Sequence, residues 1–454
     1  MPTIFAKTAL LEEGWASDVR LTLQGGKITT IKQAASAKPE DITVSTLLPA
    51  LANLHSHSFQ RAMAGMTEFR TKGQDSFWTW RDLMYRFTRH ITPEQVEAIA
   101  ALAFMEMQEA GFASVGEFHY LHHQPGGQPY AALAELSNSV FAAAQTTGIG
   151  LTHLPVLYSY GGAGMAALAG GQARFGNNVE QYNRLVSAVQ DSAKHLPADT
   201  RIGIAPHSLR ATSPADLSAL LAAHPSGPVH IHIAEQPKEV ADISAWLGAR
   251  PVEWLLDNAP VNPRWCLIHT THMSHAETKA LAKSGAVAGL CPITEANLGD
   301  GPFNGPTYLK HGGRFGIGSD SNIRISLTEE LRTLEYSQRL RDGTRNVLAG
   351  ESGSVGQTLY LGAARGGAQA LGRASGSLRI GALADLVAIN READSLCALP
   401  NHQLLDGLAF AADSSIITDL WSAGRHCVQN GHHVARAQIS AKYRIAISGL
   451  MAAL

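Results

Sequence analysis

The 454-residue sequence is poor in several features that would define its class at once. Its four cysteines are Cys266, Cys291, Cys397 and Cys427. They lie far apart and form no C-x-x-C pair, which argues against a structural zinc cluster or a disulfide framework. The first residues, MPTIFAKTALLEEGW, lack the basic segment and apolar core of a signal peptide. A run of about 20 apolar residues is also missing, so we expect a cytoplasmic protein without a membrane span.

Charge is scarce as well. Only 16% of the residues are charged, the formal net charge is −2, and no Lys/Arg-rich run occurs, so the sequence lacks the electrostatic signature of nucleic-acid binding. An acidic small molecule held by a few local arginines remains compatible with this composition. The 45% hydrophobic content provides ample core for a large barrel with an appendage, or for several ordinary domains. The one unusual count is twenty histidines, which directs attention to metal ligands.

Short apolar runs alternate with helix-like segments through the middle of the chain. The runs lie at residues 47–55, 113–120, 148–157, 201–207, 229–235, 264–272, 286–293 and 314–320. Segments such as 93–111 between them begin with Thr-Pro or Ser-Pro, which is typical of a capped helix start. This order predicts an α/β fold, a (β/α)8 TIM-like barrel with its active site at the carboxyl ends of the strands. A doubly wound sheet is the alternative, and the absence of a glycine-rich phosphate fingerprint argues against it.

Both ends of the chain are rich in short β patterns with glycine turns. These patterns cover residues 1–48 and recur over 377–436, with 377–390 as one predicted strand. Neither end is long enough to form a stable sheet alone. We therefore predict that 1–48 and 373–454 combine into a small β-sandwich-like domain with a C-terminal tail, and that 49–372 form the metal-dependent catalytic barrel.

Polar side chains recur where the predicted barrel strands end. In strand order they are His55 and His57, His232 and Glu235, His269, and Asp320. Alternate residues of a strand share a face, so two histidines one residue apart can point to the same centre. An isolated H-x-H is more often a polar loop, and a Ser-Asp at a strand end is more often a helix cap. Together, however, imidazoles and a carboxylate at strand ends indicate a divalent-metal site, most often zinc.

Several motifs resemble the metal-dependent amidohydrolase superfamily over nearly the whole chain. They are LPALANLHSH, HIHIAE, LIHTTH, GIGSDSN and GSLRIGALADLVAIN. Within it, HSHSFQRAMAG and FWTWRDLMYR are similar to the formimidoylglutamate deiminases. This resemblance implies a hydrolase of linear amidines that converts N-formimidoyl-L-glutamate into N-formyl-L-glutamate and ammonia in histidine degradation. It also implies a homodimer.

The resemblance further implies a role for each residue at the strand ends. The metal ligands would be His55, His57, His232 and Asp320. Asp320 would also take a proton from the attacking water, His269 would orient that water, and Glu235 would shuttle protons. Two-metal relatives use a bridging lysine on the fourth strand, whereas RIGIAPHSLR contains none, so we predict one zinc per subunit. Iron or nickel fits the same donors.

A substrate with two carboxylates requires cations at a fixed distance from the metal, and arginine grips a carboxylate better than lysine does. By resemblance, the substrate-binding set is Gln60, Arg81, Tyr120, His207 and Arg210. The competing interpretations are an Arg81 that pairs with Asp82 or Asp75, a surface Arg210 and a merely packed Tyr120.

Two other functions remain open at this stage. A deaminase of a heterocycle such as guanine, an adenosine derivative or a triazine would use the same metal ligands, although two arginines are an odd lining for a neutral ring. A barrel that has lost catalysis would be expected to have lost ligands. The loop at 299–313 is either a lid or a plain connection, and His119 and His230 have no assigned role.

Overall fold

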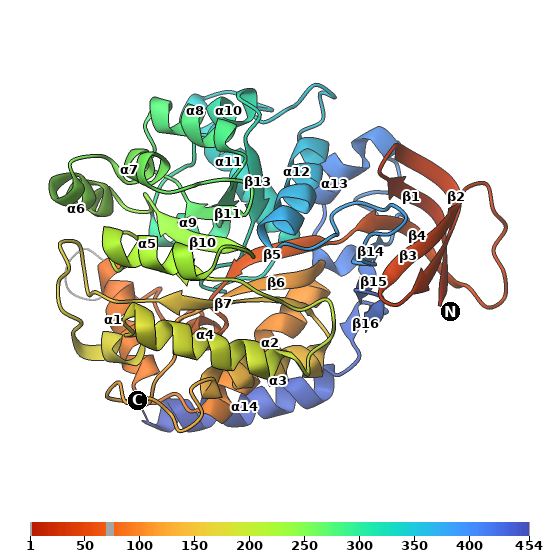
Figure 1. The fold of residues 1–454 in the computed structure, drawn as a ribbon. Helices are drawn as coiled ribbons and strands as arrows, with labels where there is room; N and C mark the ends of the chain where they lie inside the picture. Colours follow the sequence, from red (N-terminus) through yellow and green to blue (C-terminus); the bar gives the residue numbers. More distant parts are fainter. Residues whose placement is uncertain (1, 70–76, 454) are drawn as a thin grey trace.

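The computed structural model describes residues 2–69 and 77–453 (Figure 1). Parallel strands form its centre: β5 (Leu51–Ser56), β6 (Phe112–His119), β7 (Gly150–Leu157), β8 (Arg201–Ile202), β9 (Ala205–Pro206), β10 (Val229–Ile233), β11 (Trp265–His269), β12 (Val287–Leu290) and β13 (Arg314–Ile317). Single parallel bridges from Ile204 to Val229 and from Ser56 to Asp320 join the two ladders at both seams. The strands therefore close into the predicted barrel, with β8 and β9 sharing the fourth position.

Helices surround the barrel in the order that the βα alternation predicts (Figure 1). They are α2 (Pro93–Glu109), α3 (Glu135–Thr147), α4 (Val179–Ala193), α5 (Pro214–Ala223), α6 (Pro237–Leu247), α7 (Pro251–Asn258), α8 (His275–Ser284), α9 (Pro292–Leu298), α10 (Gly305–Lys310), α11 (Leu327–Asp342) and α12 (Val355–Ala370). Thr92 begins α2 with a capping box to Gln95, which satisfies backbone donors at the helix start. The segment at 299–313 contains α10.

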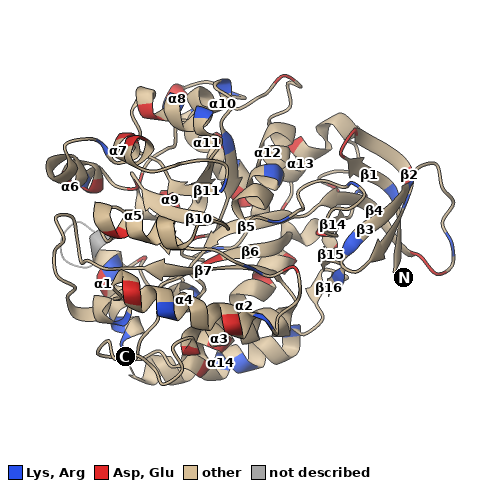
Figure 2. Cartoon of the chain, viewed as in Figure 1, with Lys and Arg blue, Asp and Glu red and all other residues tan. Residues whose placement is uncertain are grey.

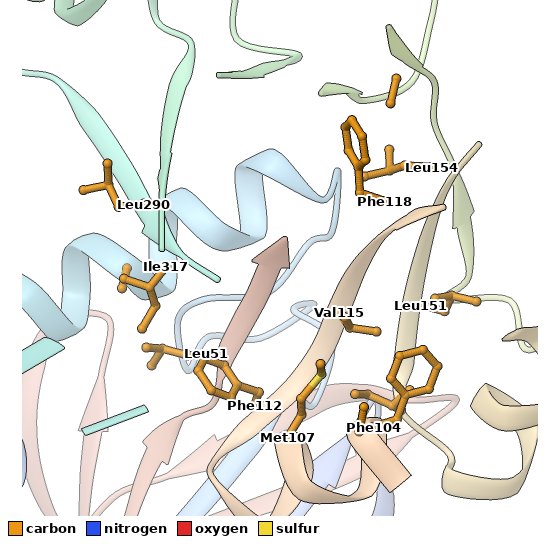
Figure 3. Packing of buried hydrophobic residues seen from close by; sticks show 14 of the residues in the cluster. Leu51, Phe104, Met107, Phe112, Val115, Phe118, Leu151, Leu154, Leu290 and Ile317 are labelled. Carbon is orange, nitrogen blue, oxygen red and sulfur yellow. The ribbon is translucent and has the colours of Figure 1, made fainter. Parts of the chain in front are cut away.

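Apolar side chains from the barrel strands and from the helices that surround them pack into one large buried cluster. Figure 3 shows this packing, with Phe112 beside Leu51 at one level and Phe118 beside Leu154 at another. Charged residues of both signs are interspersed over the outer helices (Figure 2). In the described part of the chain, no helix combines the length and the apolar character that crossing a membrane would need.

The two ends of the chain share one eight-stranded sheet, which Figure 1 shows to the right of the barrel in red and blue. Its strands are β1 (Thr3–Leu11), β2 (Gly14–Gln24), β3 (Lys27–Lys32), β4 (Ile42–Pro49), β14 (Leu386–Ile389), β15 (Ile417–Ser422), β16 (Arg425–Gln429) and β17 (His432–His433). β4 pairs with β1 on one side and with β14 on the other. The two ends of the chain therefore lie side by side and combine in one small β layer, as the fold class predicted.

The predicted strand at 377–390 is longer than the strand in the structure. Only Leu386–Ile389 of the predicted strand at 377–390 is a strand, because the chain turns at Gly381, whose φ is +87°. After α13 (Leu404–Phe410) and the last strands, α14 (Arg436–Ala453) leaves the sheet and packs along α2 of the barrel (Figure 1). The domain boundaries at 48/49 and 372/373 stay a prediction.

Buried ion pairs tie the sheet to the barrel. Nη2 of Arg373 lies 3.1 Å from Asp199, in the segment before β8, and 3.1 Å from Asp385, next to β14. Arg425 of β16 is 2.8 Å from the same Asp199 carboxylate. Because the Arg373 side chain is fully buried, the two carboxylates are needed to compensate its positive charge away from water.

Candidate active site

The four predicted metal ligands meet at the carboxyl end of the barrel. His55 is the last residue but one of β5, His57 directly follows that strand, His232 lies near the end of β10, and Asp320 follows β13. Nε2 of His55 is 3.0 Å from Nε2 of His232 and 3.4 Å from Oδ1 of Asp320, while Nε2 of His57 is 3.2 Å from the same oxygen. All four residues are buried, and one donor atom of each lies within 4.8 Å of the others.

Hydrogen bonds to backbone carbonyls orient two of these imidazoles. Nδ1 of His57 lies 2.9 Å from the carbonyl of Phe118, and Nδ1 of His232 lies 3.1 Å from the carbonyl of His207. A carbonyl oxygen only accepts, so both protons are on Nδ1 and both Nε2 lone pairs face the centre.

Burial also favours the neutral form of His55 and His232. It lowers the pKa of His55 to about 3 and the pKa of His232 well below its usual range. Neutral imidazole nitrogens and a carboxylate oxygen around one centre match the N/O donors that zinc and similar divalent ions bind. The residues present therefore fit a single metal ion.

The backbone that carries Asp320 is strained and held by hydrogen bonds. Asp320 has a φ of +46° and Asn322 a φ of +56°, the left-handed region that side chains rarely adopt. The amide of Asp320 donates to the carbonyl of His55, and the amide of His57 donates to the carbonyl of Asp320, both at 2.9 Å. The Asn322 side chain donates to the carbonyls of Asp320 and His57 at 3.1 and 3.2 Å. These bonds fix the first and last barrel strands beside the metal group formed by His55, His57, His232 and Asp320.

His269 and Glu235 face the metal group from two other strands. Nε2 of His269 lies 3.8 Å from Oδ2 of Asp320 and 3.9 Å from Oε1 of Glu235. Its Nδ1 is 3.3 Å from Oε1 of Glu295. Burial lowers the pKa of His269, but the hydrogen bond to Glu295 and the surrounding carboxylates outweigh this effect and raise it to about 10. The three carboxylates thus form an acid–base cluster around one imidazole.

A second group of possible metal donors shares His269. It comprises His269, Cys291 and Glu295. Oε1 of Glu295 already accepts the amide of Cys291 at 2.9 Å, and burial raises the pKa of the Cys291 thiol well above its usual range. A protonated thiol is a poor ligand, because metals bind the thiolate. This group therefore does not weaken the prediction of one metal.

A pocket opens above the metal group, and all five predicted binding residues line it. They are Gln60, Arg81, Tyr120, His207 and Arg210. Gln60 comes from the short helix η1 (Ser58–Met63) after β5, and Arg81 comes from α1 (Phe77–Thr88). The other three follow β6 and β9. Thus the structure brings the metal group and two arginines to one cavity.

Contacts inside the pocket bear on the competing interpretations. The side chain of Arg210 is only 12% exposed, and its Nη2 lies 3.0 Å from Oε2 of Glu235, so it is not a surface arginine. Tyr120 accepts a hydrogen bond from Nε2 of Gln60 at 2.6 Å. The guanidinium of Arg81 lies 5.5 Å from the ring centre of Tyr85. Asp75, one of the proposed partners of Arg81, is outside the described residues.

Several residues of the site were not found from the sequence. Tyr85, Tyr158 and Phe175 line the pocket with aromatic surface, and Glu295 and Asn322 bond the residues around the metal group. For Asn322, the available signal was its place in GIGSDSN beside Asp320. The aromatic residues gave none, because aromatics also occur throughout an ordinary core. His230 bonds the carbonyl of Ala370 at 2.8 Å and serves the core.

Comparison with known proteins agrees with this geometry. The protein-family model described as "Amidohydrolase family" matches residues 46–427. A second family model, described as "Formimidoylglutamate deiminase HutF, N-terminal domain", matches residues 1–43. Formimidoylglutamate deiminase of Pseudomonas aeruginosa is 48% identical over 95% of this chain and 96% of its own. The chain belongs to the amidohydrolase family, in its formimidoylglutamate deiminase branch. This membership confirms the resemblance that the motifs indicated.

Other members of the amidohydrolase family are similar over most of the chain. A crystal structure of an amidohydrolase from Brucella melitensis matches with a TM-score of 0.96 and 47% identity, over 99% of this chain and 100% of that one. A 5-methylthioadenosine/S-adenosylhomocysteine deaminase of Shouchella clausii is 28% identical over 83% of this chain and 80% of its own.

Proposed function

We propose that the protein is a formimidoylglutamate deiminase that uses one bound metal ion. It hydrolyses N-formimidoyl-L-glutamate to N-formyl-L-glutamate and ammonia, a step of histidine degradation. The observation that carries the proposal is one cavity with four metal donors at its base and two arginines, Arg81 and Arg210, in its walls. This arrangement suits a substrate with an amidine at one end and two carboxylates at the other. Zinc is the proposed metal, and iron or nickel would fit the same donors.

The proposed mechanism assigns one proton step to each acid–base residue. His55, His57, His232 and Asp320 would hold the Zn²⁺, which when bound would supply a water molecule with its pKa lowered towards about 7. Asp320 takes a proton from the attacking water, which is oriented by His269, whose Nε2 lies 3.8 Å from Oδ2 of Asp320. A C–O bond forms at the formimidoyl carbon while its C=N π pair moves to the terminal nitrogen. The C–NH2 bond then breaks as a C=O bond forms and the hydroxyl proton passes to Glu235. Glu235 delivers the proton with which the nitrogen leaves as ammonia, and a group placed in this way contributes roughly 10²–10⁴-fold to the rate.

Substrate recognition is assigned to the pocket walls. Arg81 and Arg210 bind the two carboxylates, and His207, Tyr120 and Gln60 add hydrogen-bonding groups. The aromatic rings among the lining residues cover the methylene groups of the substrate. Arg210 is already paired with Glu235, so an incoming carboxylate shares this guanidinium.

Variants of the two arginines test the substrate assignment. We expect Arg81→Ala and Arg210→Ala to lower kcat/KM for formimidoylglutamate by an amount equivalent to about 1–3 kcal/mol, with metal content unchanged. Steady-state ammonia release and elemental analysis measure both quantities. Loss of the metal in either variant would contradict the assigned role of that arginine.

Deamination of a heterocycle is the second candidate, since a relative at 28% identity is named as an adenosine-type deaminase. A neutral ring has no carboxylate with which the two arginines in the pocket could pair. Ammonia release from formimidoylglutamate is therefore compared with release from guanine and from 5-methylthioadenosine. Activity on a ring alone would refute the proposed substrate.

A non-catalytic barrel is tested with the metal ligands themselves. We expect His55→Ala and Asp320→Asn to lose both metal and activity. Full activity in the metal-free protein and in both variants would refute metal-dependent catalysis. The homodimer and the cytoplasmic location stay predictions, which sedimentation and cell fractionation test.

A further inference from the structure

A buried carboxylate lies directly behind the pocket wall that carries Glu235. Glu239, in the first turn of α6, is fully buried. One of its oxygens accepts the backbone N–H of Ala234 at 3.3 Å, and the other accepts the backbone N–H of Glu235 at 3.0 Å. The described residues that line the pocket do not include Glu239. Any effect of this carboxylate on the reaction is therefore transmitted through its neighbours.

The two hydrogen bonds hold a strained turn. Ala234 has a φ of +53°, in the left-handed region that favours glycine. Such a residue keeps its conformation only where the surrounding structure fixes it. The turn lies between the metal ligand His232 and Glu235, so it determines where the Glu235 side chain points relative to the metal group.

The same carboxylate faces the arginine that pairs with Glu235. Oε2 of Glu239 lies 3.9 Å from Nε of Arg210, and Oε2 of Glu235 lies 3.0 Å from Nη2 of Arg210. Nε of Arg210 is buried and has no hydrogen-bond partner among the described residues. One buried guanidinium is thus placed between two carboxylates, only one of which faces the pocket.

We propose that Glu239 is a positioning residue that fixes Glu235 and Arg210 as one unit. The inference rests on the proposed function, which gives Glu235 a proton transfer and Arg210 a substrate carboxylate. When that carboxylate reaches Arg210, it shares the guanidinium with Glu235 and weakens their ion pair, so that Glu235 can turn towards the departing nitrogen. Glu239 then supplies the negative charge that keeps Arg210 in the pocket, and its two backbone bonds limit how far the Glu235 turn moves.

The chain contains a matched control for this residue. Glu335 of α11 is also fully buried, and its two oxygens accept the consecutive amides of Val347 and Leu348, both at 2.9 Å. It also pairs with an arginine, Arg339, at 2.6 Å. Glu335 does not line the pocket among the described residues. A Glu→Gln change at either position removes one charge and one good acceptor from the same kind of environment.

The test compares Glu239→Gln and Glu335→Gln with the unmodified protein in its metal-loaded form. We expect Glu239→Gln to lower kcat for ammonia release roughly 10- to 100-fold, the range for a misplaced catalytic group, and to raise KM by a smaller factor. KM rises because Arg210 keeps its own charge but loses the carboxylate that holds it in the pocket. We expect Glu335→Gln to lower the melting temperature by a similar amount while leaving kcat unchanged, with full metal content in both variants.

Glu239→Asp provides the second measurement if Glu239→Gln does not fold. It keeps the charge opposite Arg210 but withdraws the carboxylate by one methylene, so kcat falls less and KM rises less than in Glu239→Gln. An unchanged kcat in the folded Glu239 variants, or equal losses of kcat in Glu239→Gln and Glu335→Gln, would overturn the positioning role alone. An unmodified protein without activity on formimidoylglutamate would overturn the proposed function and this inference together.

Discussion

Acid should destabilise this protein through a buried histidine far from the reaction. His153 of β7 is fully buried, its Nε2 lies 3.0 Å from the hydroxyl of Ser137, and its ring centre lies 5.1 Å from that of His119. Burial is the main cause that lowers the pKa of His153 from 6.5 to about 3, and the nearby His122 adds to it. The folded protein therefore keeps this ring neutral under conditions where the unfolded chain protonates it.

The sign and the size of the effect follow from proton linkage. The pKa of His153 is lower in the folded protein than in the unfolded chain. Its contribution to the free energy of unfolding is therefore complete above about pH 6.5 and decreases as the pH falls towards 3. Each pH unit below the unfolded pKa removes about 1.4 kcal/mol. Between about pH 7 and about pH 5 this one group therefore removes about 2 kcal/mol from the free energy of unfolding.

The measurement is urea unfolding at both pH values for the unmodified protein and for His153→Leu. The variant fills a similar volume without titrating, so we expect it to lose about 2 kcal/mol less than the unmodified protein between about pH 7 and about pH 5. Metal release affects both proteins alike and cancels in this difference. His195→Asn, at an exposed position, is the control and should behave like the unmodified protein. Equal pH dependence in His153→Leu and the unmodified protein would refute the reasoning.

Three further predictions concern the metal group and the connection between barrel and sheet. Asn322→Ala keeps all four ligands but removes the bonds that hold the Asp320 backbone, so metal affinity should fall about 10- to 100-fold in a chelator competition; unchanged affinity would contradict this support. Removal of the metal should abolish ammonia release and lower the melting temperature, and added zinc should restore both; activity that survives removal would exclude metal dependence. Arg373→Met leaves Asp199 and Asp385 without the buried guanidinium that they share. It should lower the free energy of unfolding, measured by urea titration, by about 3–5 kcal/mol. A smaller loss would mean that water reaches these carboxylates.

The barrel and its metal group were largely predictable because their signals are local. Each predicted apolar run overlaps a barrel strand or, in the fourth position, two short ones. The position of His55, His57 and Asp320 at strand ends then placed them at one face, since all parallel strands of a barrel end on the same side. The arrangement of the terminal strands was less predictable, because β-patterns do not state which strands become neighbours.

The supporting contacts were not predictable from the sequence. Glu239 and Glu295 look like ordinary helix acids, yet the structure places one against the Glu235 turn and the other against His269. Asn322 meets the carbonyl of His57 across 265 residues of chain. Contacts of this kind depend on how distant segments meet, and no periodicity within either segment encodes that meeting.

The sequence by itself determined the fold class and pointed to the metal donors, because strand periodicity and strand-end positions are properties of short segments. The five predicted pocket residues came from the resemblance to a family. The tertiary structure alone decided that Arg210 is shared between two carboxylates and that the imidazole lone pairs face one centre. These features depend on distances between side chains of different strands and helices, which are set only when the whole barrel closes.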